Sequence, residues 1–347
     1  MAKVLIFNNT QRRDINPLIT QSASKSHNYN IVNPGKLYAN PYHCKKKHMG
    51  LFEFIKRILL CMVLFWESRN YDVLILDTTI TGILMSLLLF FKRKPKIVIS
   101  HFNVLRRRGF LGKWIGRLLF KRIDHCFVHS GTDIEIAVDL YCLPKEHLSF
   151  RPFVRLTAPA HGEPNNVYLS GDQKPFILSY GVNARDYKTF FRAIEGTDLS
   201  AIVVARDYNL AGLDIPDNVR TFCNIPLAEC DRLVGKCLFT VFTFDGSEPS
   251  CGQISIVTSF MLGKPTICTD IAGVRDYVSD GENGLLVKLG DVDDLRNKIL
   301  KLTHDKELYN HLSAGARAWA RQYSDPRALQ KTVDDLVTRL VSCDSPR

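Results

Sequence analysis

A glycine that precedes an expected helix is the first feature of this 347-residue chain that could do chemistry. In "CGQISIVTSFMLGKPTICTD", Gly252 stands before a helix predicted over residues 253–262, and Gly263 and Pro265 end that helix. The first amides of a helix are unpaired and partly positive, so those of Gly252 and Gln253 could hold a phosphate. A glycine at this place also serves ordinary turn geometry, and this reading stays open.

A basic side chain follows another apolar run. Arg206 ends "AIVVAR", a run typical of a buried strand. In parallel sheets, ligands bind beyond the carboxyl ends of the strands. Arg206 is therefore a candidate for contact with an anionic ligand, with a solvated surface arginine as the alternative.

Short apolar runs alternate with helical patterns along the chain, which is typical of βα units and parallel sheets. The first half contains "KVLIF", "DVLILD", "KIVIS" and "HCFVHS", and the second contains "FILSYGV", "SAIVVARD", "LFTVFTF" and "PTICTD". Between them, "LTAPAHGEPNNVYLSGDQK" is rich in Pro, Gly and Asn. We expect an α/β protein with two Rossmann-like parallel-sheet domains that face each other across a cleft. The predicted domains are 1–155 and 174–347, joined by a linker at 156–173, and the final helix is allowed to pack back on the N-terminal domain.

Cysteine usage and the N-terminus indicate the compartment. The ten cysteines form no repeated C-x-x-C and no paired Cys/His cluster, which argues against a disulfide framework and a zinc site. The N-terminus lacks the basic start and cleavage site of a secretory signal. The longest nearly uncharged run, residues 78–91, is shorter than the about 20 residues of a spanning helix. A cytoplasmic location is expected.

Positive charge is concentrated in the first half. Residues 1–155 hold 25 Lys and Arg against 10 Asp and Glu, a net charge of +15, whereas the rest of the chain carries −4. Such a basic half indicates a polyanionic partner, either nucleic acid or an anionic membrane surface. No nucleic-acid-binding motif is recognisable, so the membrane is the expected partner.

Two segments, 45–60 and 104–122, combine basic residues with apolar residues at helical spacing, as interfacial membrane helices do. We expect peripheral association with the inner face of the cell membrane. The alternative is a core-facing helix with a solvated basic face. The predicted membrane and acceptor contacts are Arg106, Arg107, Arg108, Lys113, Trp114 and Arg117.

Three segments of the second half resemble one enzyme family. They are "PFILSYGVNARDYKTFFRAI", "NVRTFCNIPLAECDRLVGKCLFTVFTFD" and "GKPTICTDIAGVRDYVSDGENGLLV", in this order. They resemble the C-terminal nucleotide-sugar domain of the retaining glycosyltransferases of family 4, which have the two-domain GT-B architecture. Weaker similarities run through the first half. The resemblance implies an enzyme that transfers a sugar from a nucleotide-sugar donor to an acceptor.

The resemblance also assigns roles to residues. It places a donor phosphate contact at Arg185, with Lys188 as a weaker second candidate, and the alternative is a loop arginine paired with Asp186. It places His101, after "KIVIS", near the transferring sugar, where it could orient a hydroxyl or act as a base toward the acceptor. The loop that brackets the nucleotide base falls on "FCNIP", with Phe222 and Asn224.

The chain departs from the family pattern at two places. The two glutamates that the family separates by seven residues fall on Ser250 and Thr258, so both carboxylates are absent. Thr258 could accept a hydrogen bond and Ser250 could contact sugar or phosphate, but neither carries charge. In the loop after the first strand, Asn8 and Asn9 stand where the family usually has glycines, and they could supply amides.

These features predict a glycosyltransferase that acts on a lipid-linked saccharide acceptor in bacterial surface-polysaccharide biosynthesis. No cofactor and no metal are expected, because no D-x-D or similar carboxylate pair is placed for a cation. Two alternatives stay open. One is a nucleotide-sugar epimerase or hydrolase on the same fold, and the other is a catalytically silent binding or scaffold protein, which the missing carboxylates favour.

Overall fold

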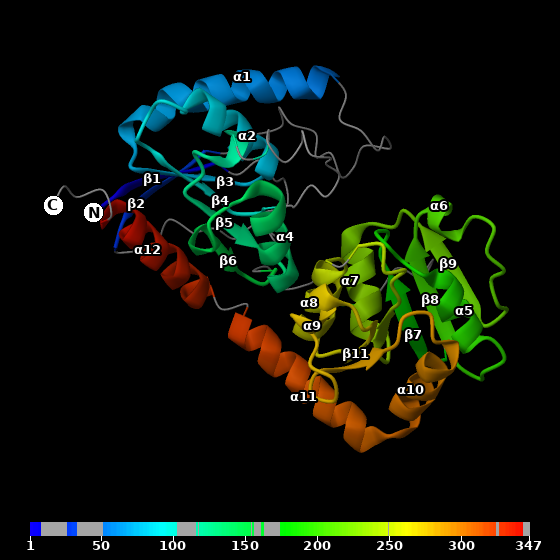
Figure 1. Ribbon diagram of the computed structural model, residues 1–347. Coiled ribbons are helices and arrows are strands. Elements are labelled where there is room, and N and C mark those ends of the chain that lie inside the picture. Colours follow the sequence, from blue (N-terminus) through cyan, green and yellow to red (C-terminus); the bar gives the residue numbers. More distant parts are fainter. Residues whose placement is uncertain are drawn as a thin grey trace. The chain divides into compact units, whose positions relative to one another are not determined.

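The computed structural model divides the chain into two compact α/β units, coloured along the sequence in Figure 1. Unit 1 comprises residues 1–152 and 325–347, and unit 2 comprises residues 153–324. The residues that the structure describes are 1–7, 26–32, 51–102, 116, 118–153, 155, 161–162, 174–248, 250–323 and 326–342, with the side chains of 51–54 and 326 excepted.

Unit 1 is built on a six-stranded parallel sheet with the order β2-β1-β3-β4-β5-β6. Its strands are β1 (Lys3–Phe7), β2 (Asn28–Val32), β3 (Val73–Leu76), β4 (Lys96–Ile99), β5 (His125–Val128) and β6 (Leu148–Phe150). The strands β3 and β5 are buried at every residue, as expected for a parallel sheet that is covered on both faces.

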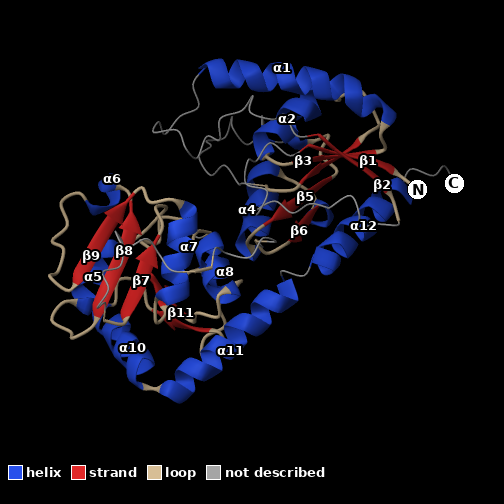
Figure 2. Cartoon of the chain, turned by 180° about the vertical axis from the view of Figure 1, so that it is seen from behind, coloured by secondary structure: helices blue, strands red, loops and turns tan. Residues whose placement is uncertain are grey.

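Helices cover both faces of this sheet (Figure 2). They are α1 (Leu51–Glu67), α2 (Thr79–Leu88), α4 (Gly131–Tyr141) and α12 (Pro326–Ser342), with short 3-10 turns η3 (Ser68–Asn70) and η4 (Lys145–His147). Successive strand residues point to opposite faces. Leu74 therefore packs in the cluster that holds Leu64 of α1 and Met85 of α2, while its neighbour Val73 packs in the cluster that holds Val333 of α12.

Unit 2 repeats this plan with a sheet of order β12-β11-β10-β7-β8-β9, also parallel. Its strands are β7 (Phe176–Tyr180), β8 (Ser200–Ala205), β9 (Val219–Cys223), β10 (Thr240–Phe242), β11 (Thr266–Thr269) and β12 (Gly284–Val287). Its helices are α5 (Tyr187–Ile194), α6 (Asp207–Leu210), α7 (Leu227–Lys236), α8 (Gln253–Met261), α9 (Ala272–Arg275), α10 (Val292–His304) and α11 (Lys306–Tyr323). One face of the sheet packs on α7, α8 and α11, and the other packs on α5 and α10.

The division between the units falls three residues before the predicted domain boundary at residue 155. The Phe153 amide donates to Tyr277 Oη at 2.9 Å, and Arg155 forms an ion pair with Asp231 at 2.8 Å. Both partners are in unit 2, so these contacts place residues 153 and 155 there. The final helix, α12, belongs to unit 1. Of the predicted linker, only residues 161–162 are described.

The predicted helix is present, and the nearly uncharged run of the first half is also largely helical. The helix predicted over 253–262 is α8, and the apolar run 78–91 forms α2 followed by a turn. Most of the segment 104–122 lies outside the described residues. None of the helices within the described ranges combines the length and the apolar character needed to cross a membrane.

Candidate functional site

Four neighbouring strands of unit 2 end beside each other, and a predicted site residue follows each of them. The strands are β10, β7, β8 and β9, in this order across the sheet. Gly252 follows β10 through a loop, Arg185 follows β7, Arg206 follows β8 and Asn224 follows β9. Because all four strands are parallel, their carboxyl ends lie along one edge of the sheet.

The start of α8 is open. Gly252 is the residue before the helix, its φ is 81°, and as a glycine it has no side chain that could cap the helix start. A Cβ at Gly252 would overlap the ring of Phe244. The glycine is therefore required both by the left-handed backbone and by the close approach of Phe244. The uncapped amides of this nine-residue helix form an electropositive end suited to an anion.

Arg185 points its guanidinium toward this helix start. Its Nη2 donates to the Tyr180 carbonyl at 2.9 Å and to Ser255 Oγ at 3.2 Å. Its Nη1 lies 3.2 Å from the position that a Cβ of Gly252 would occupy. Both Nη1 and Nε are buried and have no hydrogen-bond partner among the described residues. Two donors of a fixed charge are thus left for a ligand beside the open helix end.

Aromatic rings hold the Arg185 side chain, and no carboxylate among the described residues pairs with it. The guanidinium carbon lies 4.6 Å from the ring centroid of Phe244 and 5.0 Å from that of Phe242. Cation–π contact offsets part of the cost of burying the charge. Asp186 does not pair with Arg185. Its carboxylate accepts a hydrogen bond from the Thr189 amide at 3.0 Å and caps α5.

The side chains that stand at the positions of the two missing glutamates form hydrogen bonds within unit 2. The buried Thr258 donates from Oγ1 to the Ile254 carbonyl at 2.8 Å and accepts from Arg155 Nη1 at 3.2 Å. Ser250 Oγ accepts from Nε2 of the buried Gln253 at 2.7 Å. Thr258 therefore has its hydrogen and one lone pair engaged, while Ser250 lies at the helix start.

The remaining predicted donor residues of unit 2 lie near the ends of β8 and β9, except Lys188, which is in α5 after β7. The Arg206 Nη1 donates to Asn224 Oδ1, which links the two strand ends. Asn224 has a left-handed φ of 60°, and the neighbouring Phe222 is partly buried with Arg220 stacked 5.4 Å from its ring centroid. Lys188 is exposed in the first turn of α5.

Unit 1 has its own polar edge, where His101 is joined by residues that the sequence did not single out. Asp77, His101, His129 and Arg151 follow β3, β4, β5 and β6. The rings of His101 and His129 have their centroids 4.8 Å apart, and His101 Nδ1 is 3.0 Å from Ser100 Oγ. Asp77, His129 and Arg151 could have been found in the sequence in the same way as His101, because each directly follows a short run that forms a strand.

The second histidine of this pair is neutral. His129 Nδ1 lies 2.8 Å from the Arg151 carbonyl oxygen, so Nδ1 carries the proton and donates it. Burial, helped by the positive charge of Arg151, lowers the pKa of His129 to about 3. The Arg151 side chain donates from Nη2 to the Ser100 carbonyl at 3.1 Å and lies 4.5 Å from the Phe127 ring centroid. A neutral ring thus lies against His101, and a fixed cation is hydrogen-bonded to the residue before it.

Several predicted residues lie outside the described part of the chain: Asn8, Asn9, Arg106, Arg107, Arg108, Lys113, Trp114 and Arg117. Within the described part, no group of three or more His, Cys, Asp or Glu side chains is placed to hold a metal ion.

Solved structures share this fold over the whole chain. HepE of Anabaena, crystallised with UDP and glucose, aligns with a TM-score of 0.69 and 14% identity, over 98% of this chain and 100% of that one. Sucrose-phosphate synthase of Thermosynechococcus elongatus aligns with a TM-score of 0.71 and 12% identity, over 99% and 100% of the two chains. The fold class is that of the GT-B glycosyltransferases, as predicted.

Part of unit 2 is similar in sequence to a known family. Residues 208–319 match the family model described as glycosyl transferases group 1, and the predicted resemblance is confirmed in this part of the chain. EpsD of Bacillus subtilis, which is named as a glycosyltransferase, is 32% identical over 81 residues, or 23% of this chain. A Methanocaldococcus jannaschii protein, also named as a glycosyltransferase, is 34% identical over 96 residues, or 28% of this chain. The matched segments span 21% and 26% of those two relatives.

Proposed function

We propose that this protein is a glycosyltransferase that takes its sugar from a nucleotide-diphosphate donor, most simply a UDP-sugar. The observation that carries the proposal is Arg185, whose buried Nε and Nη1 have no partner among the described residues and which lies beside the open start of α8. A diphosphate would satisfy both donors and the helix amides together. The UDP in the structure of HepE, which has the same fold, supports the choice of nucleotide.

In the proposed reaction, the bond between C1 of the sugar and the diphosphate oxygen breaks, and its electron pair stays on the diphosphate. Arg185 and the first amides of α8 stabilise this negative charge as it develops. The acceptor hydroxyl forms the new bond to C1, and its proton passes to a base or to the departing diphosphate. We propose retention of configuration from the family resemblance alone. Resident metal is not part of this proposal, because a guanidinium and a helix end supply the positive charge.

His101 is the proposed base or orienting group for the acceptor hydroxyl. Its ring is partly exposed, in contrast to the buried His129. The hydrogen bond to Ser100 Oγ and the contact with the neutral His129 ring limit the orientations open to it. A histidine with a fixed orientation and access to solvent is suited to general base catalysis.

A lipid-linked saccharide at an anionic membrane surface is the proposed acceptor, in the assembly of a bacterial surface polysaccharide. The support is the net charge of +15 on residues 1–155, which favours association with anionic lipid. The predicted basic contacts between residues 106 and 117 remain part of this proposal.

A donor-binding protein without turnover is the second candidate. It is favoured by Thr258, whose hydroxyl is engaged by Ile254 and Arg155 at the position where the family has a carboxylate. The two candidates are separated by assaying UDP release from a panel of UDP-sugars with and without membrane lipid extract. Release that depends on the extract supports transfer, and tight UDP-sugar binding with no release under any condition supports the second candidate.

The donor site itself is tested by isothermal titration of UDP into Arg185→Ala. Loss of a charge-assisted contact to phosphate is expected to raise the Kd for UDP by roughly 10- to 100-fold. Arg192→Ala is the matched control, because Arg192 is an exposed arginine of α5 in the same unit, and its Kd should stay within about twofold of wild type. An unchanged Kd in folded Arg185→Ala would place the nucleotide elsewhere.

A further inference from the structure

The outward side of α1 is apolar over its whole described length. Ile55, Leu59, Met62, Val63 and Trp66 are 45%, 59%, 50%, 58% and 62% exposed. Their spacing of four, three, one and three residues places them on one side of the helix. The opposite side packs Cys61 and Leu64 into the core of unit 1. We call the five exposed side chains the α1 surface.

A surface helix of a soluble domain normally turns polar residues to water. In α1, the flanks of the α1 surface hold Lys56, which is partly buried, and Glu67, and no charged residue interrupts it. A contiguous apolar surface of this kind marks a site of contact with a membrane or another protein. The choice between these partners depends on the charges around it.

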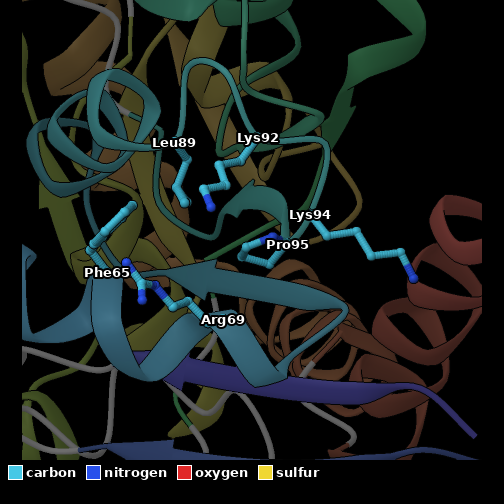
Figure 3. A pocket seen from close by; sticks show the side chains of 6 residues that line it. All are labelled: Phe65, Arg69, Leu89, Lys92, Lys94 and Pro95. Atoms are coloured by element: carbon cyan, nitrogen blue, oxygen red, sulfur yellow. The ribbon is translucent and has the colours of Figure 1, made fainter.

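Three basic side chains, together with the acidic Glu67 and Asp72, lie beside the C-terminal end of α1. A pocket of about 250 Å³ lies there, and Figure 3 shows the side chains that line it, Phe65, Arg69, Leu89, Lys92, Lys94 and Pro95. Lys94 extends away from the others and pairs with Asp72 at 3.0 Å. Arg69 stacks 3.7 Å from the ring centroid of Trp66, the last residue of the α1 surface. The pocket therefore adjoins the α1 surface and brings cations to its edge.

The chain adds further apolar and basic groups next to this pocket. Leu87 and Leu88 at the end of α2 are 47% and 40% exposed, and Phe91 is 97% exposed. Lys92, Arg93 and Lys94 follow at once and are all exposed. An exposed aromatic ring next to a run of cations is typical of segments that lie at the boundary between lipid headgroups and acyl chains.

We propose that the α1 surface inserts into the interfacial region of an anionic bilayer and that the pocket lined by Arg69 and Lys92 receives lipid phosphate. A second copy of this chain fits the surface less well, because two domains of like positive charge would be brought together there. Anionic lipid complements both the apolar surface and its basic edge. The inference rests on the proposed membrane-linked function for its setting. It assigns the contact to α1, of which residues 51–60 belong to the predicted segment 45–60, and not to the predicted segment 104–122.

The first test is flotation of the full chain with neutral phosphatidylcholine vesicles and with vesicles that contain phosphatidylglycerol. Wild type should bind the anionic vesicles. Leu59→Glu should lower the partition coefficient about tenfold or more, because a charge replaces an inserted apolar group. Leu227→Glu is the matched control, an exposed leucine at the first residue of α7 in unit 2. Equal binding of wild type and Leu59→Glu would overturn the inference.

The pocket is tested with Arg69→Gln combined with Lys92→Gln. This variant should lose most of the preference for anionic over neutral vesicles while it keeps its residual apolar binding. The preference should also fall as salt is raised. An unchanged preference would overturn the assignment of lipid phosphate to the pocket.

A quenching measurement separates this surface from the predicted basic segment. The chain has three tryptophans, among them Trp66 and Trp114. Vesicles with brominated acyl chains should quench wild-type emission, and Trp66→Phe should remove a large part of the quenching. Loss of quenching in Trp114→Phe alone would overturn the inference, as would a dimer in solution that Leu59→Glu dissociates without any vesicle binding. UDP titration of the same variants keeps the two proposals apart, because Leu59→Glu should bind UDP as wild type does whether or not vesicles bind.

Discussion

At the scale of single residues, Arg185 depends on two glycines. A Cβ at Gly181 would overlap the Arg185 guanidinium, and one at Gly252 would overlap the Phe244 ring that packs on it. Gly181 has a φ of 128° and Gly252 has a φ of 81°. The guanidinium can occupy its position only because both neighbouring residues lack side chains.

Gly252→Ala is therefore expected to impair the donor site more than it impairs the fold. Any non-glycine residue at positive φ costs on the order of 1–2 kcal/mol of stability. Gly290→Ala is the matched control, because Gly290 has a φ of 70° and its added Cβ meets nothing within 4 Å. Both variants should lose stability in urea unfolding, and Gly252→Ala should lose more, because its Cβ also displaces the buried Phe244 ring. Only Gly252→Ala should weaken UDP binding. Equal UDP affinities for the two variants would contradict the role of the Gly252 contact.

The residues of this site differ in how far the sequence could reveal them. Arg206 is a candidate because it ends an apolar run, Gly252 because it precedes a predicted helix, and Arg185 because the family resemblance places a phosphate contact there. Phe244 and Ser255 could not be predicted as partners of Arg185, because their contacts with it form only when β7, β10 and α8 pack together. The hydrogen bond from Arg155 to Thr258 could not be predicted for the same reason, because 103 residues separate the two in the chain.

At the scale of elements, β5 makes the stability of unit 1 sensitive to acid. Burial lowers the pKa of His125, in the strand, and of His129, just after it, to about 3. In the unfolded chain both titrate near 6.5. Between these values the unfolded state binds more protons, so the free energy of unfolding falls as the pH falls below about 6.5. Each histidine contributes a slope of up to about 1.4 kcal/mol per pH unit.

Urea unfolding of the full chain between pH 7.5 and pH 4.5 measures this slope. The double variant His125→Gln and His129→Gln should give a flatter dependence on pH, even if its stability at pH 7.5 is lower. His161→Gln, at an exposed position, should leave the slope unchanged. A double variant with the wild-type slope would show that other groups carry the acid sensitivity.

The ion pair of Arg155 with Asp231 ties the first residues of unit 2 to α7. Both side chains are 5% exposed, and the guanidinium makes two contacts with the carboxylate, at 2.8 and 3.1 Å. Asp231→Ala should lower the free energy of unfolding by about 3–5 kcal/mol, because it leaves a buried charge without its partner. Arg232→Ala breaks the more exposed pair with Glu229 in the same helix and should cost about 0–1 kcal/mol. Urea unfolding distinguishes these outcomes, and a similar small loss for both variants would contradict the role of burial.

The strands could be predicted from sequence better than the orientation of the helices. Buried parallel strands are apolar at every residue, so runs such as "KIVIS" and "HCFVHS" are visible without any contact information. The helix α1 reads "LFEFIKRILLCMVLFWE" and has apolar residues on every side, with charged residues only at Glu53, Lys56, Arg57 and Glu67. Its sequence cannot indicate which side meets the core, and only the packing of Cys61 and Leu64 identifies the outward one.

At the scale of the whole molecule, charge and fold divide the chain at nearly the same place. The positive charge belongs to residues 1–155, which nearly coincide with the first segment of unit 1. Unit 2, the part that holds the group 1 family match, carries the proposed donor phosphate site. We therefore expect that mutations can change membrane affinity and nucleotide affinity separately. A negative result for one of the two proposals then leaves the other proposal standing.

The last helix of unit 1, α12, follows unit 2 in the sequence. This order affects how the protein folds during synthesis. One face of its sheet, with Val4, Val73 and Phe127, is covered by Val333 and Val337 of α12. A ribosome completes the six strands early but releases α12 only after all of unit 2. During that interval the nascent sheet keeps an apolar face open to water, a state prone to aggregation and to capture by chaperones. Unit 1 is therefore synthesised first, but its folding is completed last.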